Sequence, residues 1–155
     1  MNHKSFILFA LLLLSTVLPV FCHDKAVANA FAQAENFAKQ QKTFASSKDE
    51  GAKQQSHQNV QQIKSITSAL KPAQLVELVK MCKTKVHETP SDSKHQSYSA
   101  YLESLMHISI LRLGELRTAD SAKALEELKP VLAGASSLTE TLAEAESKLK
   151  GTNKP

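Results

Sequence analysis

The sequence predicts an all-α protein of about six amphipathic helices. Its 155 residues include only four glycines and five prolines, too few for the frequent turns of a β-sandwich or a β-barrel. Apolar residues recur at spacings of three and four along most of the chain, and no segment alternates convincingly with period two. Short connections favour antiparallel neighbours, so two arrangements fit: a compact antiparallel bundle or three stacked helical hairpins.

The first 22 residues are typical of a signal peptide. Lys4 precedes an unbroken apolar run from Phe6 to Leu14, which is short for a membrane span. Cleavage after Cys22 would make the protein secreted or periplasmic, with no transmembrane segment left. A lipidated Cys22 or an uncleaved anchor would instead tether the chain to a membrane. Cleavage leaves about 133 residues with a net charge of +3 and one cysteine, because the segment carries a single charged residue.

The rest of the chain is expected to form one domain. This all-helical domain covers residues 23–151, and residues 152–155 form a tail. The segment 23–58 is expected to be looser, because the residues that open its second helix are polar throughout.

The first two predicted helices run from Asp24 to about Ser47 and from about Ala52 to Leu70. Asp24 is a suitable N-cap for the first of them. Each helix carries one apolar stripe that would face the core. The stripes consist of Val27, Ala30, Phe31, Ala34, Phe37, Ala38, Phe44 and Ala45 in the first helix, and of Val60, Ile63, Ile66 or Thr67, and Leu70 in the second.

The third helix is predicted to begin at Pro72, because proline fits the first helical position, where its missing N–H costs nothing. Thr89 stops this helix and, with Asp92, resembles the cap of the next one. The fourth helix is predicted from about His95 to Leu116. Apolar residues cover most of its circumference, so we expect it to be the central helix. The stripe of the third helix is Leu75, Val79, Cys82 and Val86.

The last two helices follow a tight turn at residues 117–120. Pro130 is expected to kink or end the fifth helix. Ser137 and Glu140 form a capping-box pattern at the start of the sixth, which Gly151 ends. The two apolar stripes are Ala122, Leu125, Leu128 and Leu132, and then Leu138, Leu142, Ala145 and Leu149.

The segment from Leu113 to Leu125 resembles the inter-helix turn of a HEAT-type repeat. It has a Leu-Gly pair at the end of one helix, then a turn, then Ala and Leu at the start of the next. The usual Gly-Asp-Pro turn of the family is replaced here by Arg117-Thr118-Ala119. This resemblance implies three stacked HEAT-like hairpins and a protein-binding scaffold with a concave surface.

Two sets of residues are candidate binding residues. After cleavage, every remaining phenylalanine would lie on the first helix, where it can dock in a partner's groove, lie on a membrane or cover the core. Two tyrosines and two apolar neighbours on the central helix can instead line a pocket for an apolar ligand. The first set is Phe31, Phe37 and Phe44, and the second is Tyr98, Tyr101, Leu105 and Met106.

Candidate chemistry is sparse. Cys82, His87 and His95 offer zinc-ligand types, but their spacing matches no compact zinc signature. Cys82 lies on an apolar stripe, so its role stays open between a core residue, an intermolecular disulfide and a metal ligand. Glu103 and His107 lie one helical turn apart, and an enzyme would need them to converge with the other histidines. No catalytic motif, metal or cofactor is predicted.

The sequence therefore favours an exported protein-interaction module without catalysis, such as an adaptor, an inhibitor or a secreted effector. The basic residues are spread along the chain, which does not favour nucleic acid as a partner. The alternative is a helical carrier of a small apolar ligand or lipid. A pocket larger than about 300 Å³ beside Tyr98 and Met106 would favour the carrier, and a filled core with an exposed apolar groove would favour the protein binder.

Overall fold

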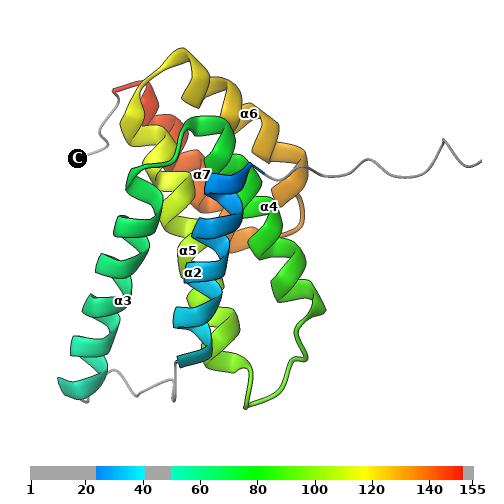
Figure 1. Cartoon of the computed structure of the whole chain (residues 1–155). Helices are drawn as coiled ribbons and strands as arrows, with labels where there is room; N and C mark the ends of the chain where they lie inside the picture. The colour runs from blue at the N-terminus through cyan, green and yellow to red at the C-terminus, as the bar shows by residue number, and fades with distance from the viewer. Residues whose placement is uncertain (1–23, 41–49, 152–155) are drawn as a thin grey trace, which may run out of the picture.

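The computed structural model describes residues 24–40 and 50–151. Within these residues the chain forms helices and no strands, which confirms the all-α fold (Figure 1). None of the described helices is both long enough and apolar enough to span a bilayer. The predicted signal peptide and the tail lie outside the described residues. The six helices described are α2 (Lys25–Gln40), α3 (Glu50–Ser68), α4 (Pro72–Glu88), α5 (Gln96–Leu116), α6 (Ala119–Leu132) and α7 (Ser136–Leu149).

Helix α5 lies at the centre and contacts all five other described helices, as its apolar circumference predicts. Consecutive helices pair as the hairpins α2–α3, α4–α5 and α6–α7. Contacts of α4 with α2 and α6, and of α5 with α3 and α7, place the hairpins side by side in two layers (Figure 1). Diagonal contacts of α5 with α2 and α6 close this arrangement into a compact bundle.

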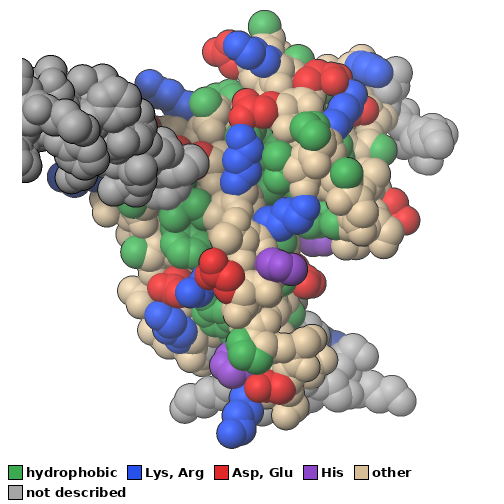
Figure 2. All heavy atoms as spheres, turned by 90° about the vertical axis from the view of Figure 1, so that its right-hand side faces the viewer, with side chains coloured by type: hydrophobic (Ala, Val, Ile, Leu, Met, Phe, Trp, Pro, Cys, Tyr) green, Lys and Arg blue, Asp and Glu red, His purple; other side chains and the backbone are tan. Residues whose placement is uncertain are grey.

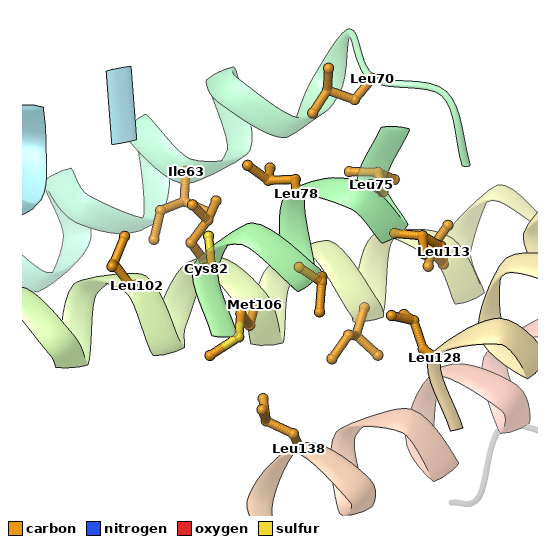
Figure 3. Close-up of a cluster of buried hydrophobic side chains, with 14 of the residues drawn as sticks. Ile63, Leu70, Leu75, Leu78, Cys82, Leu102, Met106, Leu113, Leu128 and Leu138 are labelled. Atoms are coloured by element: carbon orange, nitrogen blue, oxygen red, sulfur yellow. The ribbon is translucent and has the colours of Figure 1, made fainter. Parts of the chain in front are cut away.

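The core forms around α5, where side chains from neighbouring helices converge (Figure 3). Ile63 of α3, Cys82 of α4 and Leu102 of α5 are completely buried, and Leu128 and Leu138 extend the cluster to α6 and α7. Burial removes these side chains from water, which is the main favourable term in folding. The four later stripes predicted from the sequence therefore contribute to one continuous core.

Helix α2 faces the core with small residues, which differs from the prediction. Phe31 and Phe37 are only half-buried and pack at the edge of the core cluster. Small side chains let the α2 backbone approach α4 and α5 closely, and this leaves the two rings on the flanks. Phe44 and Ala45 lie outside the described residues. The buried residues of α2 are Val27, Ala30, Ala34 and Ala38.

Several helix starts follow the predicted signals. Asp24 caps α2 by accepting a hydrogen bond from the backbone N–H of Ala26 at 2.9 Å. Pro72 occupies the first turn of α4, as predicted. The Gln74 side chain accepts from the N–H of Lys71 at 2.8 Å and donates to Asp24 at 2.7 Å, which ties the starts of α2 and α4 together.

Two predicted N-caps are wrong, although Thr89 does end α4 as predicted. Thr89 is the C-cap of α4, and its hydroxyl donates to the Lys85 carbonyl at 2.7 Å. The next helix begins only at Gln96. In the turn before it, the Asp92 carboxylate accepts a hydrogen bond from the N–H of His95 at 3.0 Å. Helix α7 begins one residue before Ser137, so that serine lies inside the helix and its capping box does not form.

The turn between α5 and α6 is shorter than predicted. Arg117 adopts a left-handed conformation, with φ of 50°, and ends α5. Thr118 caps α6 by accepting from the N–H of Ser121 at 3.0 Å. Helix α6 continues through Pro130 and ends at Leu132. A residue of α4 satisfies a carbonyl in the last turn of α6, because the Lys83 ammonium donates a hydrogen bond to the Val131 carbonyl. A cation at the C-terminal end of a helix also interacts favourably with the helix dipole.

Helices α5 and α7 approach each other very closely at Gly114. A Cβ atom at this position would lie 2.7 Å from the Cα of Ala145, closer than folded proteins tolerate. The obstacle is backbone rather than a flexible side chain. The glycine therefore serves close packing of two helices, and no turn is involved.

Candidate binding groove

An open groove of about 650 Å³ lies along the outer face of α4. Phe31 of α2 borders it on one side and Glu127 of α6 on the other. Its accessible apolar surface comes from Phe31, Ala73 and Met81, whereas Val76 beneath them is 2% exposed. Figure 2, which views the molecule from the α4 and α6 side, shows hydrophobic side chains on this face among Lys, Asp and Glu side chains.

The groove exists because α4 carries apolar residues on two faces. Leu75, Val79 and Cys82 point into the core and are completely buried. Met81 lies off this stripe, and it stays half-exposed on the outer face between α2 and α6. Helices α2 and α6 both pack against α4, so they form walls along its outer face without closing over it.

Ion pairs fix the charged rim of the groove. The Lys80 ammonium lies 2.5 Å from a carboxylate oxygen of Glu127 and joins α4 to α6. The Lys85 ammonium lies 3.9 Å from the Glu35 carboxylate and links α4 to α2. Both pairs are partly exposed, so each contributes little to stability, and they bridge α4 to the helix on either side.

Glu35 connects three helices. Its carboxylate lies 3.1 Å from the Lys39 ammonium, and it accepts a hydrogen bond from the Tyr98 hydroxyl of α5 at 3.2 Å. The hydrogen bond from Lys39 is the main reason that the pKa of Glu35 lies below its ordinary value. Burial, assisted by the nearby Glu35 carboxylate, raises the pKa of Tyr98 to about 12. Tyr98 is therefore a neutral hydrogen-bond donor at physiological pH.

The structure separates the predicted aromatic candidates. Phe31 lines the groove. Phe37 packs against the core cluster and is not among the groove-lining residues. Phe44 lies outside the described residues, so its position relative to the groove is not described.

The second predicted set lies elsewhere, mostly inside the bundle. Leu105 and Met106 are buried in the core, and Tyr101 is 3% exposed. None of them, nor Tyr98, lines the groove. Burial raises the pKa of Tyr101 to about 12, and its hydroxyl has no hydrogen-bond partner among the described residues. This part of the chain is therefore packed as core.

The structure does not bring the candidate metal ligands together. No three His, Cys, Asp or Glu side chains within residues 24–40 and 50–151 are placed to hold a metal ion. Cys82 is completely buried, and burial raises the pKa of its thiol to about 12. His87 is exposed on α4, whereas the His95 ring lies 2.8 Å from the Asp92 carboxylate. Of the roles left open for Cys82, its complete burial fits a core residue.

The Glu103 and His107 pair does not form either. Glu103 is exposed, whereas the His107 Nδ1 lies 2.6 Å from the Thr141 hydroxyl of α7. That hydroxyl donates to the Ser137 carbonyl at 3.0 Å, so His107 donates to the hydroxyl oxygen. The histidine therefore links α5 to α7 by a hydrogen bond.

Sequence reasoning missed most of the groove-lining residues. Only Phe31 was a candidate, although a usable signal was present. Met81 is apolar but does not fit the core stripe of α4, and charged residues flank it at helical spacing. The lining residues that were missed are Ala73, Val76, Glu77, Lys80, Met81, Thr84, Lys85, Glu88 and Glu127.

Comparison of the chain with family models, with curated proteins and with solved structures finds no match in any of the three.

Proposed function

We propose that the chain is an exported helical protein-interaction module that acts by binding and without catalysis. The observation that carries this proposal is an exposed groove with apolar residues and a charged rim, which lies along the outer face of α4. Recessed apolar surface edged by polar residues marks interaction sites on proteins. The buried side chains of Leu105 and Met106 also favour a site on the surface over one between the helices.

The export part of the proposal rests on the pattern of residues 1–22. Mass spectrometry of the protein recovered outside the cell tests it. A chain that begins at His23 supports export with cleavage after Cys22. A chain that begins elsewhere, or that carries lipid on Cys22, contradicts this cleavage site.

Affinity capture from the native extracellular fraction tests the binding part. The Thr84→Arg variant places a long cation in the groove at an exposed position, and Ala143→Arg makes a comparable change on exposed α7. We expect the unchanged chain and Ala143→Arg to retain the same protein, and Thr84→Arg to lose it. Equal capture by all three chains would contradict the groove as the binding site.

A carrier of an apolar small molecule is the second candidate. The groove volume of about 650 Å³ supports it, because pockets for such ligands cover about 300–1,000 Å³. Solvent extraction of the natively purified protein, followed by mass spectrometry, distinguishes the two functions. A stoichiometric lipid that Thr84→Arg loses would favour the carrier, and its absence alongside a captured protein would favour the interaction module.

A further inference from the structure

The groove has the length of a helix of about four turns. The residues of α4 that line it run from Ala73 to Glu88 at successive spacings of three, one, three, one, three, one and three. This pattern is one continuous helix face, and 15 steps of 1.5 Å give it a length of about 22 Å. An occupant that lies along α4 would match this length with about 15 helical residues.

The walls favour a helical occupant over an extended one. Helices form the groove on all sides, so its walls offer no sheet edge to pair with a strand. An extended peptide would therefore leave its backbone N–H and C=O groups without partners from the groove. A helix satisfies these groups internally and can present an apolar stripe to Phe31, Ala73 and Met81.

The charges of the rim favour basic residues on the flanks of a bound helix. Three glutamates and two lysines line the groove, which makes it net acidic although the whole chain is net basic. The lysines are already engaged: Lys80 lies against Glu127, and Lys85 faces Glu35. Glu88, at one end, is exposed and makes no ion pair within the part of the chain that the structure describes. Glu88 is therefore the lining residue that offers an occupant a carboxylate without an ion pair in the described residues.

We propose that the groove binds a basic amphipathic helix of a partner protein. The helix places an apolar stripe against Phe31, Ala73 and Met81, and it carries Lys or Arg on its flanks, with one cation opposite Glu88. Charge complementarity of this kind steers association and excludes acidic competitors. This inference rests on the proposed function, because it names the partner class for the same groove.

Synthetic peptides test this inference directly. Three 15-residue peptides would share one stripe of leucines and a central tryptophan, and would differ only in flanks of Lys, Glu or Gln. The chain contains no tryptophan, so the fluorescence of the peptide alone reports transfer into an apolar site. We expect the Lys peptide to bind at least about tenfold more tightly than the Glu peptide, with the Gln peptide between them.

Variants of the full chain test whether the peptide binds in the groove. Thr84→Arg should weaken binding of the Lys peptide at least about tenfold, because it adds both bulk and a like charge. Glu88→Lys should weaken it severalfold, whereas the matched control Glu140→Lys changes an exposed glutamate on α7 and should leave binding unchanged. Circular dichroism of each variant confirms that the helices remain.

Each contrary result has a definite meaning. Equal affinity for all three peptides, or no effect of Thr84→Arg, would overturn the basic helix as the occupant. If no peptide binds but capture of a native protein is still lost in Thr84→Arg, the proposed function stands and this inference fails. If that capture does not depend on Thr84 either, both fail.

Discussion

The two sides of the bundle are built differently. On one side α5 packs most extensively against α4 and α7, with large buried residues and the close contact at Gly114. On the other side, α3 packs closely against only two of the described helices, α2 and α5. Its residues 53–58 are exposed. Local stability follows buried apolar contact, so the α4–α5–α7 side should open last and α3 first.

This difference separates the scaffold from the site. Helix α4 belongs to the stable side through Leu75, Val79 and Cys82, and its opposite face lines the groove. Helix α2, which supplies Phe31, packs through small alanines and is held by Glu35. The groove therefore lies on a helix that is anchored in the core, and α2, which packs with small side chains, borders it.

Thiol labelling should show the largest contrast. The Ser56→Cys variant carries one exposed thiol on α3, and Cys82 is buried on α4. We expect Cys82 to react about a thousandfold more slowly at pH 8, because it must wait for an opening that costs several kcal/mol. Peptide mass mapping resolves the two sites. Similar rates at both would show that the core around Cys82 opens freely.

Truncation of core side chains should show the next largest effect. Leu105→Ala removes a completely buried side chain of α5 and is expected to cost about 3 kcal/mol of unfolding free energy. Val60→Ala on α3 truncates a half-buried side chain and should cost about 1 kcal/mol or less. Urea denaturation measures both. The account of the two sides would be wrong if the α3 variant lost more.

The same glycine-to-alanine substitution can be compared on the two sides of the bundle. Gly114→Ala forces the α5 and α7 backbones apart, and the net loss should be about 2 kcal/mol despite the better helix propensity of alanine. Gly51 is exposed in the first turn of α3, so Gly51→Ala should be neutral or slightly stabilising. Thermal denaturation compares them, and an unchanged Gly114→Ala protein would contradict the close helix contact.

The smallest effect concerns Glu35. Its folded pKa lies below the unfolded value of 4.5, so its contribution is complete above pH 4.5 and is lost as the pH falls through the lower folded value. Glu35→Gln should cost about 0.5 kcal/mol at pH 7, since the pairs are partly exposed. This difference should shrink near pH 3. A constant difference from pH 7 to pH 3 would show that charge is not the cause.

Periodicity predicted the helices well because each stripe is a local property of the chain. The start of α4 at Pro72, the burial of Cys82 and the central place of α5 all follow from spacing. Periodicity failed where a neighbouring helix decides which side chains of a stripe are buried. The predicted α2 stripe joined the alanines and the phenylalanines, but only Val27 and the alanines are buried, because the packing of α2 on α4 and α5 decides which part of the stripe faces inward.

The groove was unpredictable for the same reason. Met81 and Glu127 are 46 positions apart, and they line one surface only because α6 packs on α4. The two failed caps show a smaller limit. Thr89 and Ser137 carry suitable hydroxyls, but α5 begins later than predicted, at Gln96, and α7 begins one residue earlier, at Ser136.

Photo-crosslinking from the groove tests directly whether a partner protein binds there. A photo-reactive residue would replace Thr84, which is exposed in the groove, or Ala143, which is exposed on α7. Both chains would be irradiated in the native extracellular fraction. We predict that position 84 captures one protein through a basic amphipathic helix and that position 143 does not. Identical products at both positions, or capture only at 143, would contradict the groove as the binding site.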